Sequence, residues 1–410
     1  MTCCDTPGLK PISEAMEIMR SKISALTEIE MVSLYQSLDR VLAEDVVSPM
    51  DIPPHANSAM DGFAFHSQAQ FANEPLKLVG TALAGHPYYG SCSTNECVCI
   101  MTGAHLPDGL DTVVMQENTE QQGDFIHIHK WPKSGENIRL MGEDVSKHQK
   151  ILNKGKRLGP CDLGLLAALG IAEVKVIRKL KVALIATGDE LIKPGGTLAD
   201  GEIFESNTLV LAAMLSRLNM EYKDYGIIKD DMDQLTKAFQ EADQWADIVI
   251  SSGGVSVGTA DYTKDVLEKL GTIGFWKLAI KPGKPFAFGE LSNSFFFGLP
   301  GNPVSATITF HQLAMPIMRI MQGETIDPPV TLHIPSNQPL KKHPGRQDFQ
   351  RGTLLQNAEG ELSVNSFRAQ GSGILSSMSE SNCYIVLPPQ SGSVEAEQIV
   401  QVVPFDRFIC

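Results

Sequence analysis

The chain has 410 residues, of which 43% are hydrophobic and 20% charged, and its formal net charge is −14 at pH 7. This composition is typical of a globular protein with several domains and excludes a disordered chain or a coiled coil. An acidic surface repels nucleic acid and anionic lipid, so neither is expected as a partner. No apolar run reaches the ~18 residues of a membrane span, and the N-terminus lacks a signal-peptide core. We therefore expect a cytoplasmic protein without membrane contact.

The eight cysteines are scattered along the chain, which predicts reduced thiols rather than a disulfide framework. Cys97 and Cys99 form the closest pair, but they lack a second pair at zinc spacing. His127 and His129 alternate with apolar residues in FIHIHK and would share one face of a strand. A polar outer face explains that pattern better than a metal site does.

The N-terminal half begins with a predicted helix over 10–26, where Ile, Ala and Met residues fall on one face. Residues 27–50 are mixed in character. Turn signals in 51–146 separate short β-rich stretches such as LKLVG, TVVMQE and FIHIHK, which predict a small β domain. Within 147–180, Pro160 opens a short helix and EVKVIRK follows as a strand.

From residue 181 strands and helices alternate. The strands are KVALIA, EYKDYGIIK, DIVISS and FFFGL, and the helices are NTLVLAAMLSRLN, MDQLTKAFQEAD, TKDVLEKL and VSATITFHQLAMPIMRIM. This order predicts a doubly wound, mostly parallel sheet. A Pro-rich linker follows at about 327, and the tail is β-like again over 328–410.

Glycines and carboxylates recur after the predicted strands, at the edge where an α/β sheet binds ligands. The residues are Thr187-Gly188-Asp189-Glu190, Asp230-Asp231, Ser252-Gly253-Gly254-Val255-Ser256 with Asp261, and Pro300-Gly301-Asn302-Pro303. Ser252-Gly253-Gly254, followed by a helix N-terminus, is a candidate phosphate cradle. Glu190, Asp230 and Asp261 would repel a phosphate unless a cation intervened, and Mg²⁺ fits such oxygen ligands. The alternative is that each acid caps a helix.

Several other segments have both a functional and a structural interpretation. Pro300-Gly301-Asn302 could present N–H groups to an oxyanion, or simply form a tight strand–helix turn. Lys277, Lys281 and Lys284 could neutralise an anion, or form a solvated charged run. Asp61 and Asp144 lie in acidic turns within the β domain. No Ser/His/Asp set, P-loop or GxGxxG motif stands out, so the acids and inferred Mg²⁺ suggest chemistry on a phosphate linkage.

The blocks NSAMDGFA, MTGA, GEDV, ATGDEL, SSGGVSVGTADYTK, KPGKP, GLPGNPVSA and DFQRG occur in this order and span nearly the whole chain. In this respect the sequence resembles the molybdopterin molybdenumtransferase family, to which the E domain of gephyrin is related. The resemblance implies that adenylylated molybdopterin and molybdate are converted to molybdenum cofactor and AMP with a divalent cation, usually Mg²⁺. It also implies a homodimer, with an active site between the sheet domain of one subunit and the β domain of the other.

The implied fold has four domains. They are a linking α+β domain (27–50 and 147–180), a β-rich domain (51–146), a molybdopterin-binding α/β domain with a doubly wound parallel sheet (7–26 and 181–327), and a C-terminal β-barrel-like domain (328–410). The resemblance assigns functional roles to Asp61, Thr102, Asp144, Glu190, Asp230 and Asp261, and anion-handling roles to Lys277, Lys281, Arg351 and Ser372. Thr259 stands where some relatives have an acid.

Two alternatives remain open. An adenylyltransferase that makes adenylylated molybdopterin from ATP shares the sheet domain, but such proteins are usually little more than that domain. A scaffold role, like the receptor anchoring of gephyrin-type E domains, is the other. The sequence does not indicate whether tungstate replaces molybdate or which molybdoenzyme receives the product.

Overall fold

A computed structural model describes residues 8–254 and 262–409. The chain divides into two compact units. The larger unit comprises Met1–Glu30, Asp39–Val41 and Val176–Cys410, and the smaller unit comprises Met31–Leu38 and Leu42–Lys175. The chain passes between them within β1 (Ile29–Ser33) and β12 (Glu173–Ile177), and again on either side of Asp39–Val41. Among the described residues, no helix is long and apolar enough to cross a membrane. The finer division into four domains stays a prediction.

The smaller unit is built on a six-stranded sheet of order β7-β4-β6-β5-β9-β8. The predicted β-rich stretches are confirmed as strands. The strands are β4 (Gly62–Phe65), β5 (Leu76–Ala82), β6 (Glu96–Ile100), β7 (Thr112–Met115), β8 (Thr119–Gln122) and β9 (Phe125–Ile128). Phe63 and Phe65 enter one hydrophobic cluster and Ala64 enters another, as the two-residue period of a strand requires. Both faces of this sheet are therefore covered.

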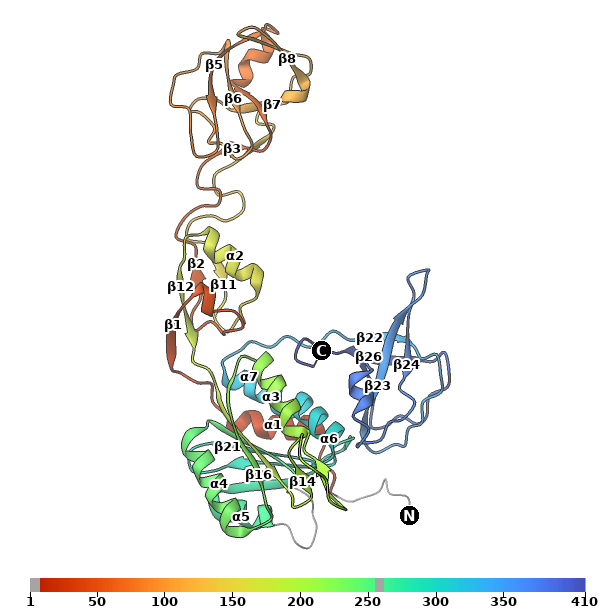
Figure 1. Cartoon of the computed structure of the whole chain (residues 1–410). Coiled ribbons are helices and arrows are strands. Elements are labelled where there is room, and N and C mark those ends of the chain that lie inside the picture. The colour runs from red at the N-terminus through yellow and green to blue at the C-terminus, as the bar shows by residue number, and fades with distance from the viewer. Residues whose placement is uncertain (1–7, 255–261, 410) are drawn as a thin grey trace. The chain divides into compact units, whose positions relative to one another are not determined.

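Short elements complete the smaller unit (Figure 1). They are β2 (Val46–Val47) paired with β11 (Lys150–Leu152), β3 (Asn57–Ser58) paired with β10 (Ile138–Arg139), α2 (Pro160–Ala168), and three 3-10 turns at Leu34–Gln36, Ser67–Phe71 and Gln116–Asn118. Pro160 stands at the start of α2 as predicted, because proline lacks the N–H that the first helical turn leaves unpaired.

The larger unit contains a second six-stranded sheet, of order β16-β13-β17-β21-β20-β18. The strands are β13 (Lys181–Thr187), β16 (Glu221–Ile228), β17 (Ile248–Ser252), β18 (Thr272–Lys277), β20 (Pro285–Glu290) and β21 (Phe295–Leu299). Strands β16, β13, β17 and β21 are parallel, whereas β20 and β18 are antiparallel to their neighbours.

The sheet is thus mostly parallel, as predicted. It is not wholly parallel, because β20 and β18 at one edge pair in the antiparallel direction. The four-residue connection between β20 and β21 is long enough for a hairpin but far too short for the crossover that parallel strands need. Neither β18 nor β20 was predicted, because the lysines, proline and glycine between them interrupt the apolar pattern of the flanking residues.

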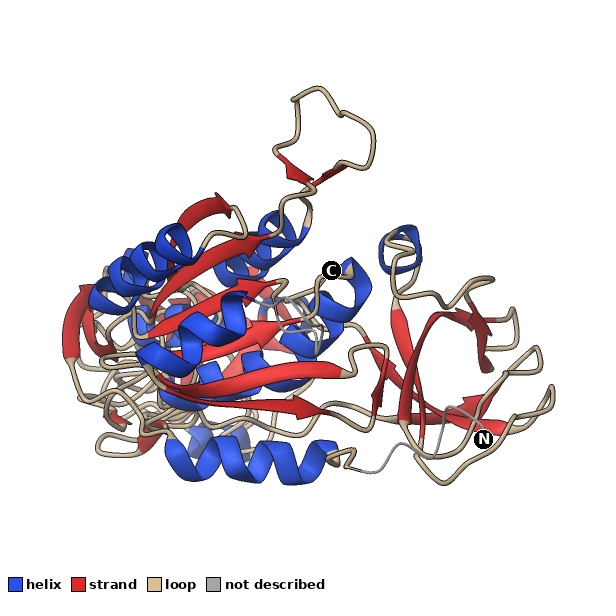
Figure 2. Ribbon diagram, turned by 90° about the horizontal axis from the view of Figure 1, so that it is seen from below, coloured by secondary structure: helices blue, strands red, loops and turns tan. Residues whose placement is uncertain are grey.

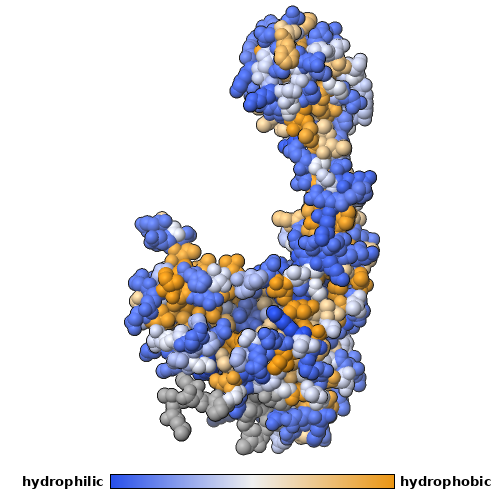
Figure 3. All heavy atoms as spheres, turned by 180° about the vertical axis from the view of Figure 1, so that it is seen from behind, coloured by the Kyte–Doolittle hydropathy of each residue, from blue (hydrophilic) through white to orange (hydrophobic). Residues whose placement is uncertain are grey.

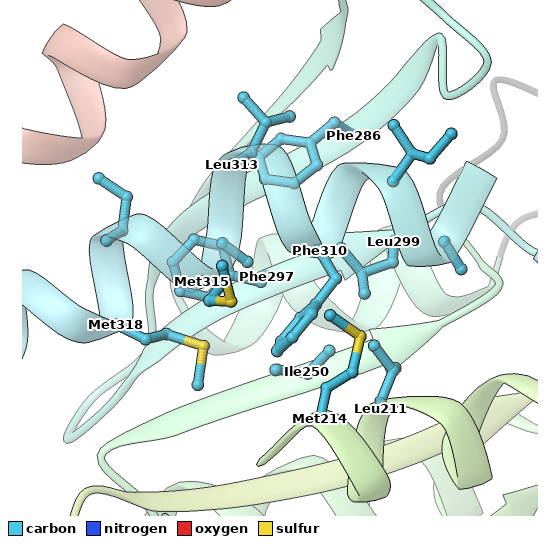
Figure 4. Packing of buried hydrophobic residues seen from close by; sticks show 14 of the residues in the cluster. Leu211, Met214, Ile250, Phe286, Phe297, Leu299, Phe310, Leu313, Met315 and Met318 are labelled. Carbon is cyan, nitrogen blue, oxygen red and sulfur yellow. The ribbon is translucent and has the colours of Figure 1, made fainter. Parts of the chain in front are cut away.

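Helices cover both faces of this sheet (Figure 2). One face packs against α1 (Ile12–Lys22), α3 (Asn207–Arg217), α6 (Pro303–Thr309) and α7 (Met315–Met321), and the other against α4 (Met232–Trp245) and α5 (Tyr262–Leu270). Figure 4 shows Phe297 and Ile250 of the sheet in the first core, together with Leu211 and Met214 of α3. Their neighbours Phe296 and Val249 enter the second core. Strands buried on both faces are continuously apolar, which is why the pattern was recognisable.

The predicted helix VSATITFHQLAMPIMRIM is interrupted by a π-turn, Phe310–Ala314, between α6 and α7. Pro316 follows this turn, near the start of α7. It has no N–H to donate to the preceding turn, so the regular α-helical ladder cannot continue through it.

The tail of the larger unit, together with β19, forms a third sheet of order β19-β23-β25-β26-β22, in which β24 also pairs with β23. Its elements are β19 (Ile280–Lys281), β22 (Leu332–Pro335), β23 (Gln347–Gln356), β24 (Leu362–Ser366), α8 (Ser376–Ser379), β25 (Cys383–Leu387) and β26 (Ile399–Pro404). A parallel bridge from Ser336, which follows β22, to Val364 of β24 links β24 to the β22 end of this strand order. The Asn337 N–H donates to Val364 O at 3.0 Å in support of that bridge. On the face shown in Figure 3, polar residues are interspersed with small groups of hydrophobic ones.

Candidate functional site

The carboxyl ends of four parallel strands meet at one edge of the larger unit's sheet. Strand β13 lies between β16 and β17, so the chain winds away from it in both directions. A crevice opens at such a switch point, and here it is a cavity of about 760 Å³. The predicted residues that line it include Glu190, Asp230, Ser252, Gly253, Gly254, Lys281, Pro300, Asn302 and Ser372.

The glycines after β17 are required by close packing. Gly253 has φ +94°, and a Cβ there would come within 2.6 Å of Thr187 O at the end of β13. Gly254 has φ +64°, and its Cβ would meet Thr263 Oγ1 at 2.4 Å, so neither position accepts a side chain. The Gly253 N–H donates to Leu299 O at 3.1 Å. That amide therefore ties strand ends together and is not a spare phosphate donor.

Asn207 was missed by the sequence reasoning. Its Nδ2 donates to Ser252 Oγ at 2.7 Å and to Gly301 O at 2.8 Å, so one amide orients the ends of two strands. It is the first residue of α3 and follows β15 (Ile203–Phe204), which pairs with β14 (Leu191–Ile192). A polar residue at that position also suits an ordinary helix start, so the sequence carried no distinguishing signal.

The acids at this edge have divided roles. Asp231 caps α4, accepting the Gln234 N–H at 2.9 Å, whereas its neighbour Asp230 lines the cavity together with Glu190. The Asp230 N–H donates to Asp189 Oδ1 at 3.2 Å. Desolvation, followed by the charges of Asp189 and Glu190, raises the pKa of Asp230. Carboxylates that repel one another here are suited to a cation.

This crowding predicts that Asp230→Asn stabilises the fold. An acid whose folded-state pKa is raised disfavours folding once it ionises, so the penalty is present above the folded-state pKa and disappears below the unfolded value of 3.8. Urea unfolding at low salt should give Asp230→Asn a higher midpoint than wild type at pH 7, with a gap that closes toward pH 3. Asp233→Asn, in the first turn of α4, should show no such gain. An unchanged or lowered midpoint for Asp230→Asn would contradict the crowding.

The predicted magnesium set of Glu190, Asp230 and Asp261 stays a prediction. Asp261 and Ser256 lie outside the described residues. Within 8–254 and 262–409, no group of three His, Cys, Asp or Glu side chains is arranged to hold a metal ion. The two described acids supply carboxylate oxygens, which are the donors that Mg²⁺ prefers.

Basic residues line the same cavity. Lys281, Lys284 and Arg346 are all present there. Lys281 Nζ lies 3.1 Å from Asp348 Oδ2, and its side chain remains 36% exposed, so it can also reach an anion. Lys277 does not line the cavity; its carbonyl accepts the Lys10 N–H at 2.8 Å. Arg346 was missed because it is separated in sequence from the lysine cluster.

Arg351 lies in the protein interior with no exposed surface. Its Nε donates to Ser377 Oγ at 3.0 Å and its Nη2 to Gly371 O at 3.1 Å. Burial lowers the pKa of its guanidinium to about 10. Ser372, which follows Gly371, accepts the Val304 N–H through its carbonyl at 3.0 Å. Arg351 therefore holds the cavity wall that carries Ser372 instead of facing the cavity.

The smaller unit carries the remaining predicted residues. Asp61 Oδ1 accepts the Thr102 N–H at 2.6 Å and the Thr102 Oγ1–H at 2.8 Å. These hydrogen bonds lower the pKa of Asp61, with the backbone bond as the largest cause. Asp144 donates its N–H to Ile52 O at 3.0 Å, and its side chain is exposed. Cys97 is buried, and burial raises the pKa of its thiol to about 12, which disfavours a role as a metal thiolate.

Three family models match the chain in succession: MoeA N-terminal region (domain I and II) over residues 10–170, Probable molybdopterin binding domain over 183–320, and MoeA C-terminal region (domain IV) over 334–405. A molybdopterin molybdenumtransferase of Haemophilus influenzae is 43% identical over 401 residues, covering 97% of this chain and 99% of that protein. One from Synechococcus elongatus is 36% identical over 403 residues, covering 95% and 98%.

A solved structure with similar architecture is that of the molybdopterin biosynthesis moeA protein from Pyrococcus horikoshii. It has a TM-score of 0.84 and 30% identity, and the match covers 97% of this chain and 100% of that chain.

Proposed function

Because the chain belongs to the molybdopterin molybdenumtransferase family, we propose that it inserts molybdate into adenylylated molybdopterin, releasing AMP and forming molybdenum cofactor. The observation that carries the proposal is the cavity at the sheet's switch point, which both carboxylates and basic groups line. Adenylylated molybdopterin carries a pyrophosphate and a dithiolene, and molybdate is a dianion. A protein of net charge −14 must bind such anions through local cationic groups.

The basic residues of the cavity would bind the anionic groups. Lys281, Lys284 and Arg346 supply the charge, and Asp348 orients Lys281 through its ion pair. Ser372 offers a hydroxyl on a wall that Arg351 holds in place. We assign molybdate and the dithiolene to these basic residues and Ser372.

The acids of the cavity would bind the pyrophosphate through a divalent cation. Glu190 and Asp230 are the described candidates to hold Mg²⁺, with Asp261 as the third. When bound there, Mg²⁺ would neutralise charge on the phosphoanhydride and make AMP a better leaving group. Ser252 Oγ, held by Asn207, stands at the end of β17 where it can position a phosphate oxygen.

The residues of the smaller unit enter through a homodimer in this proposal. Asp61, Thr102 and Asp144 would complete the site of a second subunit. The Asp61–Thr102 hydrogen bonds keep that carboxylate ionised and fixed in direction, as a group that orients a substrate or a cation needs to be.

The test is AMP release from adenylylated molybdopterin with Mg²⁺, with and without molybdate. Prompt release that requires molybdate supports the transferase. Binding of the nucleotide without AMP release would overturn it and favour a carrier or scaffold role. Consumption of ATP with molybdopterin, in the absence of molybdate, would favour an adenylyltransferase instead.

A further inference from the structure

Two histidines that are fifty residues apart in the sequence meet on the smaller unit. The imidazole rings of His55 and His105 have centroids 4.4 Å apart and an interplanar angle of 47°. His55 precedes β3, and His105 follows the loop after β6. Among the residues that the structure describes, neither ring makes a hydrogen bond or an ion pair. Their nitrogens are therefore available to a ligand.

The backbone explains why these rings meet. Asn57 and His105 form an antiparallel bridge, flanked by hydrogen bonds from Ser58 N to Ala104 O at 3.0 Å and from Leu106 N to Ala56 O at 3.0 Å. This pattern makes Asn57 and His105 a non-hydrogen-bonded pair, in which side chains approach most closely on one face. His55 lies two residues before Asn57, in the bend that leads into β3, and its ring packs against that of His105.

Asn57, the bridge partner of His105, also has an unpartnered polar atom. Asn57 is buried, and its Oδ1 has no hydrogen-bond partner among the described residues. A buried amide oxygen left unpaired is unfavourable, and an oxygen donor beside two imidazoles is a common feature of metal sites. His55 itself is exposed, so an ion can enter from solvent and keep water as its remaining ligands.

We propose that His55 and His105, with Asn57 Oδ1 or water as a further donor, form a binding site for a divalent transition-metal ion of the Ni²⁺, Cu²⁺ and Zn²⁺ series. Two imidazoles that bind one ion through nitrogens about 2.0–2.1 Å away bring their ring centroids to roughly 4.5–5 Å, close to the observed separation. Neutral imidazole suits these ions, whereas Mg²⁺ prefers oxygen. The site is distinct in donor chemistry from the acids of the cavity.

The charges around the pair agree with this assignment. Burial, followed by the effect of His105, lowers the pKa of His55, so its ring is neutral and able to coordinate at neutral pH. No carboxylate or cation other than His105 contributes to that shift. Arg139 of β10 pairs with Asn57 from the side away from His105. Arg139 is thus the charged residue directly opposite Asn57 in the β3–β10 pair.

The experiment is calorimetric titration of Ni²⁺ into tag-free protein at pH 7.5, with wild type, His55→Gln, His105→Gln and the double variant. One equivalent should bind to wild type, and each single variant should weaken binding by at least ~10-fold. The double variant should bind Ni²⁺ only slightly more weakly than the single variants, because one imidazole by itself binds the ion poorly. His129→Gln is the matched control, since His129 is an exposed histidine of the same unit, and it should bind as wild type does.

Spectroscopy with Co²⁺ separates imidazole from thiolate ligands. Cys161 is exposed and could bind metal adventitiously, and thiolate coordination would give a strong near-ultraviolet charge-transfer band. We expect only weak visible bands that disappear in both histidine variants. Failure of wild type to bind Ni²⁺, retention of binding by His55→Gln and His105→Gln, or a thiolate band removed by Cys161→Ser would each overturn the proposal. Thermal unfolding of each variant checks that the fold is intact.

Discussion

Replacing Glu190 by Gln together with Asp230 by Asn should lower molybdate-dependent AMP release by at least ~10²–10³-fold, the usual cost of removing a preorganised electrostatic group from an active site. The two acids line the same cavity, and desolvation, followed by the charges of Asp189 and Glu190, raises the pKa of Asp230. Groups that act together on one cation are not additive, so each single variant should already account for most of the loss.

The Mg²⁺ dependence distinguishes a cation-binding role from a structural one. If these acids hold the cation, each single variant should require a higher Mg²⁺ concentration for its half-maximal rate, and its fold should be retained or stabilised. Glu241→Gln on α4, an exposed acid that lies 4.0 Å from Lys237, is the control and should be unchanged in both respects. Asp261→Asn should behave like Glu190→Gln. Wild-type turnover and an unshifted Mg²⁺ titration in all three site variants would remove these acids from the mechanism.

Gly253→Ala should both destabilise the larger unit and reduce AMP release. An L-residue at φ +94° costs about 1–2 kcal/mol, and the added methyl would lie 2.6 Å from Thr187 O, a backbone atom that cannot move without shifting β13. We expect a total loss of roughly 2–4 kcal/mol in the free energy of unfolding. We also expect at least ~10-fold lower AMP release, because both strand ends carry cavity residues.

Gly195→Ala is a matched control for this variant. Gly195 has φ +91°, yet nothing lies within 4 Å of its hypothetical Cβ. It should therefore lose only the conformational part, about 1–2 kcal/mol, and little activity. Urea unfolding and AMP release of the two variants, compared side by side, measure the contribution of the close approach. Equal losses in stability would show that contact with Thr187 O imposes no constraint.

Much of the architecture was accessible from local patterns. Strands buried on both faces are continuously apolar, so KVALIA, DIVISS and FFFGL identified the parallel core of the sheet. The carboxyl ends of parallel strands share one edge. The sequence pattern alone therefore predicted that Glu190, Asp230, Ser252 and Asn302 gather at that edge.

The antiparallel strands β18 and β20 were not predicted because their short apolar runs flank a segment rich in lysine, proline and glycine. A short apolar run does not by itself distinguish a strand from other buried segments. The orientation of those strands depends on which neighbour they pair with, and pairing is a tertiary property.

The sequence alone determined which chemical groups gather at the sheet edge, because strand period, glycine positions and residue types are local properties. Only the tertiary structure decided which of two adjacent acids faces the cavity: Asp231 caps α4 and Asp230 does not. It likewise placed Arg351 in the interior behind Gly371 and Lys277 away from the cavity. His55 and His105 meet through a backbone bridge. Such outcomes depend on packing between segments distant in the chain, which no local pattern encodes.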